Sequence, residues 1–339
     1  MRYRITNSDL RAMNFSIAFN YFKRIWRELS QLSEKTGYSR FYHLCDYLSA
    51  FVRHGAHIRQ YIIGEFWRLS NAERSRRLTF YRMMRLEKKY NNRQYTHYLN
   101  SKKDFNEYFS EFIRRGWMCV KGATYSDFKG FLDKYTSIII KPLNDKQGNG
   151  IRKFTYSGQD EAELHQLFDE LSAQDALIEE CLSQHPDMVF GNTCLNTIRA
   201  MSLCGPDGKG HVMKAILRAG VGDTVVDNYA RGGSIYEVDL KTGVVTSYGK
   251  SKAGDVHLVH PKTDIVMLGY KIPMWNQVIE ICERASEKLP QVAFVGWDVA
   301  ITQDSVQLIE GNCSADYELY EYLGNTGFYE KIKAILNPK

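Results

Sequence analysis

Three oxygen-bearing side chains near the carboxyl end of the sequence could bind a divalent cation. Glu310 and Asn312 are two residues apart on a predicted strand, so their side chains point to one face. Asp298 lies on the preceding predicted strand, and a three-residue turn at 303–305 would pair it directly with Glu310, whereas a two-residue turn would not. Two carboxylates and an amide oxygen suit Mg²⁺. The alternative is a solvated polar face, but apolar neighbours such as Val299 make paired acids costly there without a cation.

An apolar strand that ends in a lysine and a glycine-containing loop could bind phosphate. Ile138–Ile140 precedes Lys141, and Gln147, Gly148 and Gly150 follow shortly afterwards. Glycine lets backbone N–H groups approach an anion closely, which suits the phosphates of a nucleotide. An ordinary hairpin turn is the alternative, and neither the P-loop pattern nor the protein-kinase motifs are present.

Basic side chains on later strands could bind carboxylate or phosphate oxygens. Lys214 and Arg218 fall on one face of a predicted strand, and Asn228 and Arg231 follow in a loop with two glycines. Surface cations are the alternative, which applies to Lys214 and to Arg199 in particular.

The elements that must position these residues are helical in the first hundred residues and mixed afterwards. Apolar residues recur at three- and four-residue spacing over 15–32 and 41–52, which predicts two amphipathic helices. Asn71 is the predicted N-cap of a helix over 73–85, and a further helix is predicted over 103–114. A strand-helix-strand stretch then ends at residue 142.

Three hairpins are predicted in the second half of the chain, and their strands are joined by tight turns. Because successive hairpins form antiparallel sheets, we predict an α+β fold rather than a doubly wound parallel one. A helix over 278–288 should precede the third hairpin. The strand pairs are 197–204 with 211–219, 234–238 with 244–247, and 292–302 with 306–310.

The composition indicates a globular, cytoplasmic protein. The chain has 339 residues, of which 44% are hydrophobic and 25% charged, which excludes collagen-like, low-complexity and largely disordered proteins. No uncharged apolar run reaches the roughly 18 residues of a membrane span, and no signal-peptide pattern follows the amino terminus. The seven cysteines are an odd number without a C-x-x-C pair, which argues against a disulfide framework and a zinc site.

The charge is unevenly distributed. Residues 1–100 carry 19 Lys and Arg against 7 Asp and Glu, a net charge of +12, and the rest of the chain carries −6. With its interleaved aromatic residues, the basic region could hold an anionic acceptor such as a nucleotide- or lipid-linked sugar, or lie against an anionic membrane surface. A solvated helical cap is the alternative. Nucleic-acid binding is not expected, because no recognised module is present.

The order of these motifs resembles the ATP-grasp superfamily and, within it, the sugar-transfer-associated ATP-grasp family, which is related to α-L-glutamate ligases. The similarity covers about residues 100–335. It implies two α+β lobes that clamp ATP, at 101–178 with the phosphate loop and at 179–339 with the metal site, after a helical arm at 1–100. The matching segments are Ile140–Pro142, Ile178–Glu180, His185–Pro186, Asn196–Arg199, Asp227–Asn228, Gly232–Gly233, Ile272–Trp275, Gly296–Asp298 and Glu310–Asn312.

The resemblance also implies ATP and Mg²⁺ as cofactors, with roles for the candidate residues. Lys141 would hold the α- and β-phosphates under the 144–150 loop, and either Lys102 or Lys103 would be a second ATP lysine. Arg218, with Asn228 or Arg231, would stabilise the charge of an acyl phosphate. Glu179, Glu180 and Leu182 would line the adenine pocket, and Asp298, Glu310 and Asn312 would bind Mg²⁺. Arg199 and Lys214 would belong to the catalytic residues.

The activity implied by the resemblance is ATP-dependent ligation of a carboxylate to an amine, or to a thiol, through an acyl phosphate. The substrates would be small molecules that are sugar-linked, in bacterial capsular or exopolysaccharide or glycoconjugate biosynthesis. Such an enzyme would work in the cytoplasm or peripherally at the inner face of the cell membrane. Two alternatives are an ATP-grasp phosphotransferase and a non-catalytic nucleotide-binding scaffold associated with glycosyltransferases.

Overall fold

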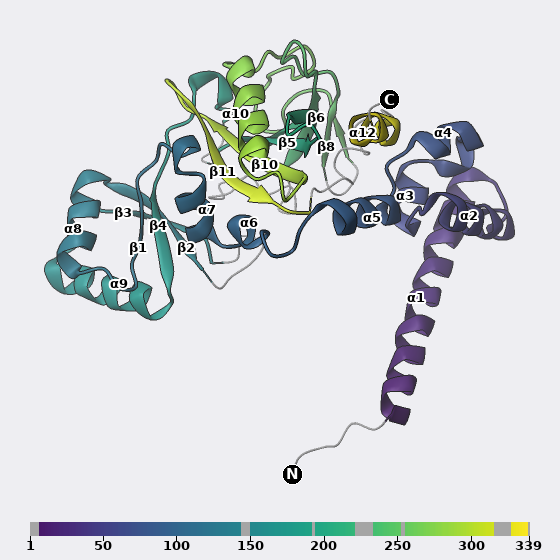
Figure 1. Cartoon of the computed structure of the whole chain (residues 1–339), viewed down its shortest axis with the longest axis horizontal. Coiled ribbons are helices and arrows are strands. Elements are labelled where there is room, and N and C mark those ends of the chain that lie inside the picture. Colours follow the sequence, from purple (N-terminus) through teal and green to yellow (C-terminus); the bar gives the residue numbers. More distant parts are fainter. Residues whose placement is uncertain are drawn as a thin grey trace. The chain divides into compact units, whose positions relative to one another are not determined.

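The structure is a computed structural model, and it describes residues 7–143, 150–191, 194–220, 233–251, 255–314 and 327–337 (Figure 1). Contacts divide the chain into two units. The helical unit comprises Met1–Arg85 with Asn325–Glu330, and the sheet unit comprises Leu86–Gly324 with Lys331–Lys339. The first boundary therefore lies at residue 85, compared with the residue 100 predicted from the sequence.

The helical unit confirms the two amphipathic helices. They are α1 (Asn7–Thr36) and α2 (Arg40–His54), and they bury Leu29, Tyr47 and other apolar residues in a common core. Four shorter helical segments follow, which are α3 (Ile58–Ile63), a 3-10 turn at Phe66–Arg68, α4 (Asn71–Arg76) and α5 (Phe80–Tyr90). The last of them, α5, continues into the sheet unit.

The prediction of a single helix over 73–85 is wrong, because the helix is interrupted between α4 and α5. The N-cap is Ser70 rather than Asn71: its hydroxyl accepts a hydrogen bond from Glu73 N–H, and the Glu73 carboxylate accepts one from Ser70 N–H. At the break, Leu78 is fully buried, and the Arg82 guanidinium donates to three carbonyls at the end of α4. The helix is thus interrupted because Leu78 is buried between α4 and α5 and the Arg82 side chain takes the carbonyls that would have continued it.

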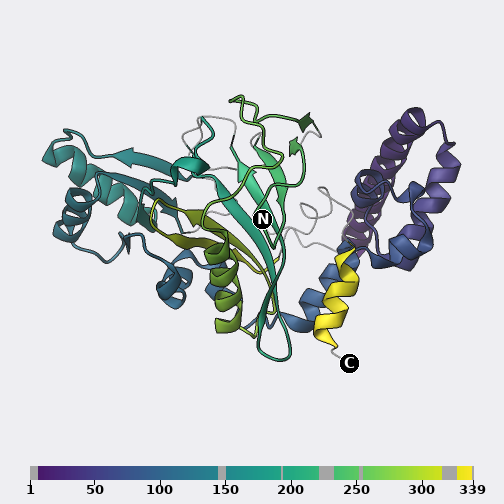
Figure 2. The same ribbon diagram turned by 90° about the horizontal axis from the view of Figure 1, so that it is seen from above.

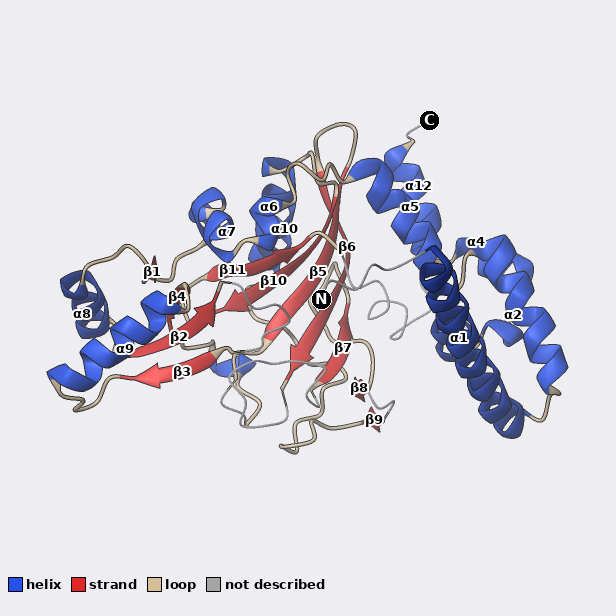
Figure 3. Ribbon diagram, turned by 90° about the horizontal axis from the view of Figure 1, so that it is seen from below, coloured by secondary structure: helices blue, strands red, loops and turns tan. Residues whose placement is uncertain are grey.

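The sheet unit begins with helices that lead into a small antiparallel sheet. The predicted helix over 103–114 is shorter than expected, since α7 (Lys102–Tyr108) ends before a 3-10 turn at Ser110–Phe112. The small sheet has the order β1-β4-β2-β3, and its apolar face packs against α8 and α9 (Figure 3). Its elements are β1 (Trp117–Cys119), α8 (Tyr125–Lys134), β2 (Ser137–Pro142), β3 (Arg152–Thr155), α9 (Glu161–Ala173) and β4 (Ala176–Glu180), and α6 (His97–Asn100) precedes α7.

The predicted lobe boundary at 178 falls inside β4. Glu179 pairs with Trp117 on β1 and with Ile139 on β2, so it belongs to the small sheet together with the residues before it. A boundary between two lobes would therefore have to follow β4, and the division of the sheet unit into two lobes remains a prediction from the sequence.

A large antiparallel sheet follows, in the order β11-β10-β5-β6-β7-β8-β9, as the hairpins predicted. Its long β5–β6 hairpin can be followed in Figure 2. Apolar side chains on one face, including Trp297 and Val299, pack against α10 (Trp275–Lys288). The strands are β5 (Thr197–Cys204), β6 (Gly210–Ala219), β7 (Ser234–Val238), β8 (Gly249–Ser251), β9 (Val256–His257), β10 (Phe294–Ile301) and β11 (Val306–Asn312), and α12 (Phe328–Leu336) ends the described chain.

The strand predicted over 244–247 is not a ladder strand. Val244 and Val245 form isolated bridges only, and β7 pairs instead with β8. The Ser247 hydroxyl accepts the Glu237 N–H at 2.8 Å, which takes that donor out of a regular ladder. All seven cysteines are free thiols, as expected. Among the helices that the structure describes, none combines the length and the apolar character that crossing a lipid bilayer requires.

Candidate functional site

Four neighbouring strands of the large sheet bring charged side chains into one row, on the face opposite α10. Asp298 on β10 pairs directly with Arg199 on β5 and with Glu310 on β11. The Arg199 guanidinium donates through Nε to one Asp298 oxygen, and through NH2 to the other at 2.9 Å. Arg218 on β6 donates to the same carboxylate at 3.0 Å. We call these four residues the charged row.

The charged row balances two carboxylates against two guanidinium groups. Burial opposes ionisation of Asp298, but Arg199 and Arg218 outweigh it and hold the pKa of Asp298 well below its usual range. Desolvation together with the adjacent Asp298 charge raises the pKa of Glu310. Ionisation is thus favoured at Asp298 by the two arginines and opposed at Glu310 by its burial and by the neighbouring Asp298 charge.

The pairing of Asp298 with Glu310 was predicted correctly, but for a wrong reason. The pair Ile301–Val306 next to the turn has the register that a two-residue turn would give, which alone would separate the two carboxylates. One extra residue on β11, Ile309, shifts the register between the pairs Val299–Leu308 and Asp298–Glu310. This β-bulge, rather than the turn, returns Glu310 to the row.

The oxygens of Glu310 and Asn312 could bind a divalent cation, and those of Asp298 could do so where a cation shares them with Arg199 and Arg218. Asn312 Nδ2 lies 3.3 Å from Glu310 Oε1, and both side chains are accessible, with 55% of the Glu310 side chain exposed. Within the described ranges, no three His, Cys, Asp or Glu side chains gather to form a metal site. Two carboxylates and one amide would therefore leave several positions of a six-coordinate Mg²⁺ to other oxygens, such as phosphates.

Lys214 lies on the same face of β6 as Arg218, at a second ion pair. Its Nζ is buried and lies 3.1 Å from Glu237 Oε1 on β7. Glu237 was missed in the sequence, although an acid within the apolar strand Ser234–Val238 is the same signal that singled out Asp298. Lys214 is thus part of an internal charge pair rather than a surface cation.

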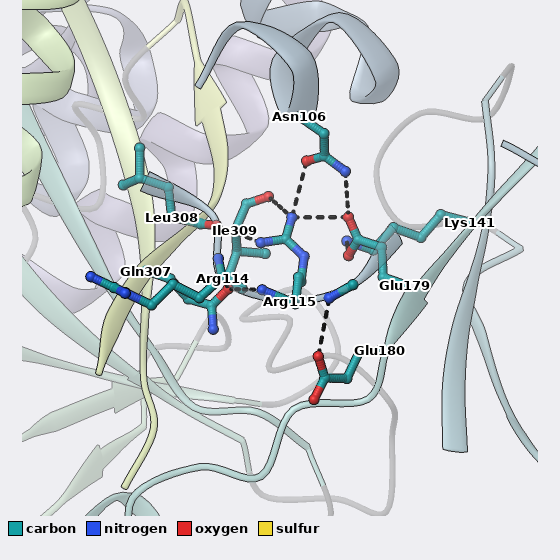
Figure 4. Close-up of polar contacts among 10 residues, drawn as sticks. Asn106, Arg114, Arg115, Lys141, Glu179, Glu180, Gln307, Leu308 and Ile309 are labelled. Atoms are coloured by element: carbon teal, nitrogen blue, oxygen red, sulfur yellow. Dashed lines mark hydrogen bonds and ion pairs between the residues drawn. The ribbon is translucent and has the colours of Figure 1, made fainter. Parts of the chain in front are cut away.

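A second polar cluster lies between the small sheet and β11 (Figure 4). The Glu179 carboxylate is buried and contacts Lys141 Nζ at 2.5 Å and Arg115 NH2 at 2.9 Å, and it accepts a hydrogen bond from Asn106 at 3.0 Å. Burial opposes ionisation of Glu179, but Arg115 and Lys141 outweigh it and hold its pKa well below the usual range. We call these four residues the Arg115 cluster.

The remaining adenine and phosphate candidates are only partly described. The Glu180 carboxylate accepts the Gly116 N–H at 3.0 Å, and Leu182 is half-buried just beyond β4. Gly150 has a positive φ of 75°, which glycine adopts without strain. The other candidates, Gln147, Gly148, Asn228 and Arg231, lie outside the described residues.

The structure distinguishes the two lysines that the sequence left open. Lys102 Nζ donates to the Pro142 carbonyl at 2.8 Å, at the end of β2 next to the glycine-containing loop. Lys103 is exposed on α7 and lies 3.8 Å from Glu107. Lys102 is therefore beside the candidate phosphate site, and Lys103 is paired along its own helix.

Arg115, Asn106 and Gln307 were also missed in the sequence. Gln307 Oε1 accepts the backbone N–H groups of Arg114 and Arg115, and Arg115 itself donates to carbonyls of β11. Two arginines before a short strand do not by themselves indicate a functional site. Partners up to 194 residues away give these side chains their role.

A hollow of about 630 Å³ lies elsewhere in the sheet unit, around Ile272, Pro273 and the start of α10. It is lined by Lys241, Lys271 and polar neighbours. Of the candidate site residues that the structure describes, none lines this hollow, so it is separate from the charged row and from the Arg115 cluster.

Solved structures with similarity to the chain include ATP-grasp ligases. The ligase PsnB with a phosphomimetic variant of its minimal precursor, Mg and ADP has a TM-score of 0.39 and 15% identity, covering 70% of this chain and 57% of that one. PsnB with a precursor peptide and AMPPNP has a TM-score of 0.40 and 15% identity, covering 71% and 60%. D-alanyl-alanine synthetase A from Vibrio cholerae has a TM-score of 0.41 and 11% identity, covering 70% and 65%.

The chain thus spans 57% to 65% of the length of the chains in these three structures. No curated protein sequence matches it. A family model of sugar-transfer associated ATP-grasp proteins matches residues 81–337, about three quarters of the chain. The match begins inside α5 and contains both sheets, so the predicted α+β fold of the ATP-grasp type is confirmed. The chain belongs to the sugar-transfer associated ATP-grasp family.

Proposed function

We propose that the protein is an ATP-dependent ligase that uses Mg²⁺ and joins a carboxylate to an amine through an acyl phosphate. The observation that carries this proposal is the charged row, where two carboxylates and two arginines meet on one face of an antiparallel sheet. Family membership supports the use of ATP. The proposed metal ligands are Asp298, Glu310 and Asn312.

The charge of the row favours a metal–nucleotide complex over a metal ion alone. Two carboxylates and two guanidinium groups already sum to zero, so a lone Mg²⁺ would leave an excess of positive charge. The phosphates of ATP supply the compensating negative charge, and Mg²⁺ when bound neutralises the phosphate that is transferred. We therefore expect Mg²⁺ to bind weakly without nucleotide.

The two arginines differ in what they can do. Arg199 donates to both oxygens of Asp298, and 7% of its side chain is exposed, so we propose that it holds that carboxylate in place. Arg218 donates through NH1 to one Asp298 oxygen, and 14% of its side chain is exposed. We propose that Arg218, with Asn228 or Arg231, stabilises the developing charge of the acyl phosphate, and that Lys214 supports this group through Glu237.

Nucleotide binding is proposed for the groups around the end of β2. Lys141 and Lys102 would contact phosphate, and Gln147, Gly148 and Gly150 would cover it. Backbone groups from Glu180 to Leu182 would contact the base. Because three donors already occupy the Glu179 carboxylate, we propose that Glu179 positions Lys141 rather than contacting adenine.

The sugar link of the family supports a proposal for the substrates. We propose that the enzyme joins an amino acid or amino compound to a sugar-linked molecule in bacterial polysaccharide or glycoconjugate biosynthesis. The net charge of +12 in residues 1–100 favours an anionic acceptor, such as a nucleotide- or lipid-linked sugar.

Hydroxylamine tests the ligase chemistry without knowledge of the amine, because it traps an acyl phosphate as a hydroxamate. Incubation with Mg-ATP and pools of amino acids and uronic acids is expected to release ADP and form a hydroxamate with one pool. Lys141→Ala should lower this rate at least about 100-fold, since it removes a cation from the phosphates. ADP without hydroxamate in every pool would instead indicate phosphotransfer, and no ADP release despite Mg-ATP binding would favour the scaffold alternative.

We also propose that the helical unit binds an anionic membrane surface. On α1, Phe19, Phe22 and Trp26 share one side of the helix and are 50%, 53% and 40% exposed. Lys23 lies over the Phe19 ring at 4.5 Å, and Arg40 lies over the Trp26 ring at 5.8 Å. Figure 1 shows the first part of α1 extending away from the other helices of its unit. Exposed aromatic and basic side chains together are typical of interfacial helices.

Vesicle co-sedimentation tests this surface. The protein is expected to bind vesicles containing phosphatidylglycerol and to leave neutral phosphatidylcholine vesicles in the supernatant, with binding that weakens as salt increases. Phe22→Ser with Trp26→Ser should weaken binding about 10-fold or more, because two apolar side chains no longer enter the interface. Tyr248→Ser, an exposed aromatic control in the sheet unit, should have no effect. Equal binding by both variants would refute the proposal.

A further inference from the structure

Arg115 is a buried arginine that bonds to both sheets of the sheet unit at once. It precedes β1, and 1% of its side chain is exposed. Through NH1 it donates to the Leu308 carbonyl at 2.6 Å, and through NH2 to the Ile309 carbonyl at 3.3 Å. NH2 also contacts Glu179 Oε1 at 2.9 Å (Figure 4).

The two carbonyls that Arg115 binds lie at the β-bulge of β11. This strand is at the edge of the large sheet, so polar backbone groups on its outer side lack a neighbouring strand. Buried carbonyls without a partner are costly, and Arg115 supplies donors to Leu308 and to the extra residue Ile309. Gln307 adds a second attachment through the Arg115 N–H. The register that places Glu310 opposite Asp298 is therefore held from outside the sheet.

The other side of Arg115 leads to the candidate phosphate lysine. Its NH2 binds Glu179, and Glu179 binds Lys141 on β2. A continuous path of contacts thus connects Ile309, next to a proposed metal ligand, with Lys141. No nucleotide contact is needed for Arg115 to act on both.

We propose that Arg115 is a positioning residue that holds Lys141 and Glu310 in a fixed relation, so that the lysine and the metal ligand act on one Mg-ATP molecule. The inference rests on the proposed function. A lysine at this position would keep the positive charge beside Glu179, but it lacks the planar fork that reaches two carbonyls as well. The two tasks of Arg115 can therefore be separated by one substitution.

The test compares Arg115→Lys with Arg114→Lys, the same substitution at the exposed neighbouring residue. Dissociation constants for ATP are measured with Mg²⁺ and with EDTA, together with thermal unfolding. Arg115→Lys is expected to bind ATP in EDTA with the wild-type dissociation constant. The factor by which Mg²⁺ lowers that dissociation constant should be about 10- to 100-fold smaller than in the wild type. Arg114→Lys should keep that tightening.

A purely structural role predicts a different result. If Arg115→Lys only lowers the unfolding temperature and keeps the full effect of Mg²⁺, the positioning role is refuted. If this variant does not fold, Gln307→Ala takes its place, because it loosens the same attachment and keeps both charges, and the same criterion applies. A wild-type protein that binds no Mg-ATP would overturn the proposed function and, with it, this role.

Discussion

Replacing Glu310 with glutamine is expected to lower the rate of ADP formation from Mg-ATP by about 100- to 1,000-fold. Glutamine keeps the shape of the side chain but removes the negative charge that attracts the cation, so higher Mg²⁺ concentrations should restore part of the rate. Because 55% of the Glu310 side chain is exposed, the free energy of unfolding should change little. Steady-state rates across a Mg²⁺ titration, with urea unfolding alongside, measure both effects.

The matched control is Glu280→Gln, which removes a carboxylate that is 66% exposed on α10 and paired with Arg284 on the same helix. Its rate and its Mg²⁺ dependence should equal those of the wild type. If Glu310→Gln behaves like this control, Glu310 is not a metal ligand and the assignment of the charged row must be abandoned.

Glu179→Gln is expected to destabilise the sheet unit by about 3–5 kcal/mol at neutral pH, since it leaves the buried Arg115 and the partly buried Lys141 without their counter-charge. The same variant should bind ATP more weakly, because Lys141 loses the group that positions it. Urea unfolding followed by tryptophan fluorescence measures the first effect, as Trp117 pairs with Glu179 in the small sheet.

The pH dependence of this difference follows from the lowered pKa of Glu179. In the unfolded chain a glutamate titrates near about 4.3, and in the folded protein its pKa lies well below that value. The stabilisation is therefore complete above about pH 4.3 and is lost as the pH falls toward the folded pKa. The stability difference between wild type and Glu179→Gln should accordingly be constant above about pH 5 and shrink steadily as the pH falls below about 4.3.

Glu280→Gln again serves as the control, because an exposed ion pair contributes little to stability. Its stability should follow that of the wild type at every pH. A constant difference between wild type and Glu179→Gln down to pH 3 would mean that Glu179 does not titrate as the Arg115 cluster requires.

Much of the site could be predicted because its parts depend on local patterns. Residue spacing placed Glu310 and Asn312 on one strand and Lys141 at the end of another, and turn residues indicated the antiparallel hairpins. The helix break at Leu78 was not predictable in this way, because the spacing of apolar residues does not show which of them will be buried between two helices.

The sequence by itself determined the two long amphipathic helices, the antiparallel hairpins and the residue types of the charged row, because helix and strand periods and tight turns involve residues close together in the chain. Only the tertiary structure decided that Ile309 forms a bulge and that Lys102 rather than Lys103 lies at the end of β2. It also decided that Arg115 joins Glu179 and Leu308, which are 64 and 193 residues away. Such contacts arise where buried polar groups must find partners, and packing, rather than any local pattern, determines which partners lie within reach.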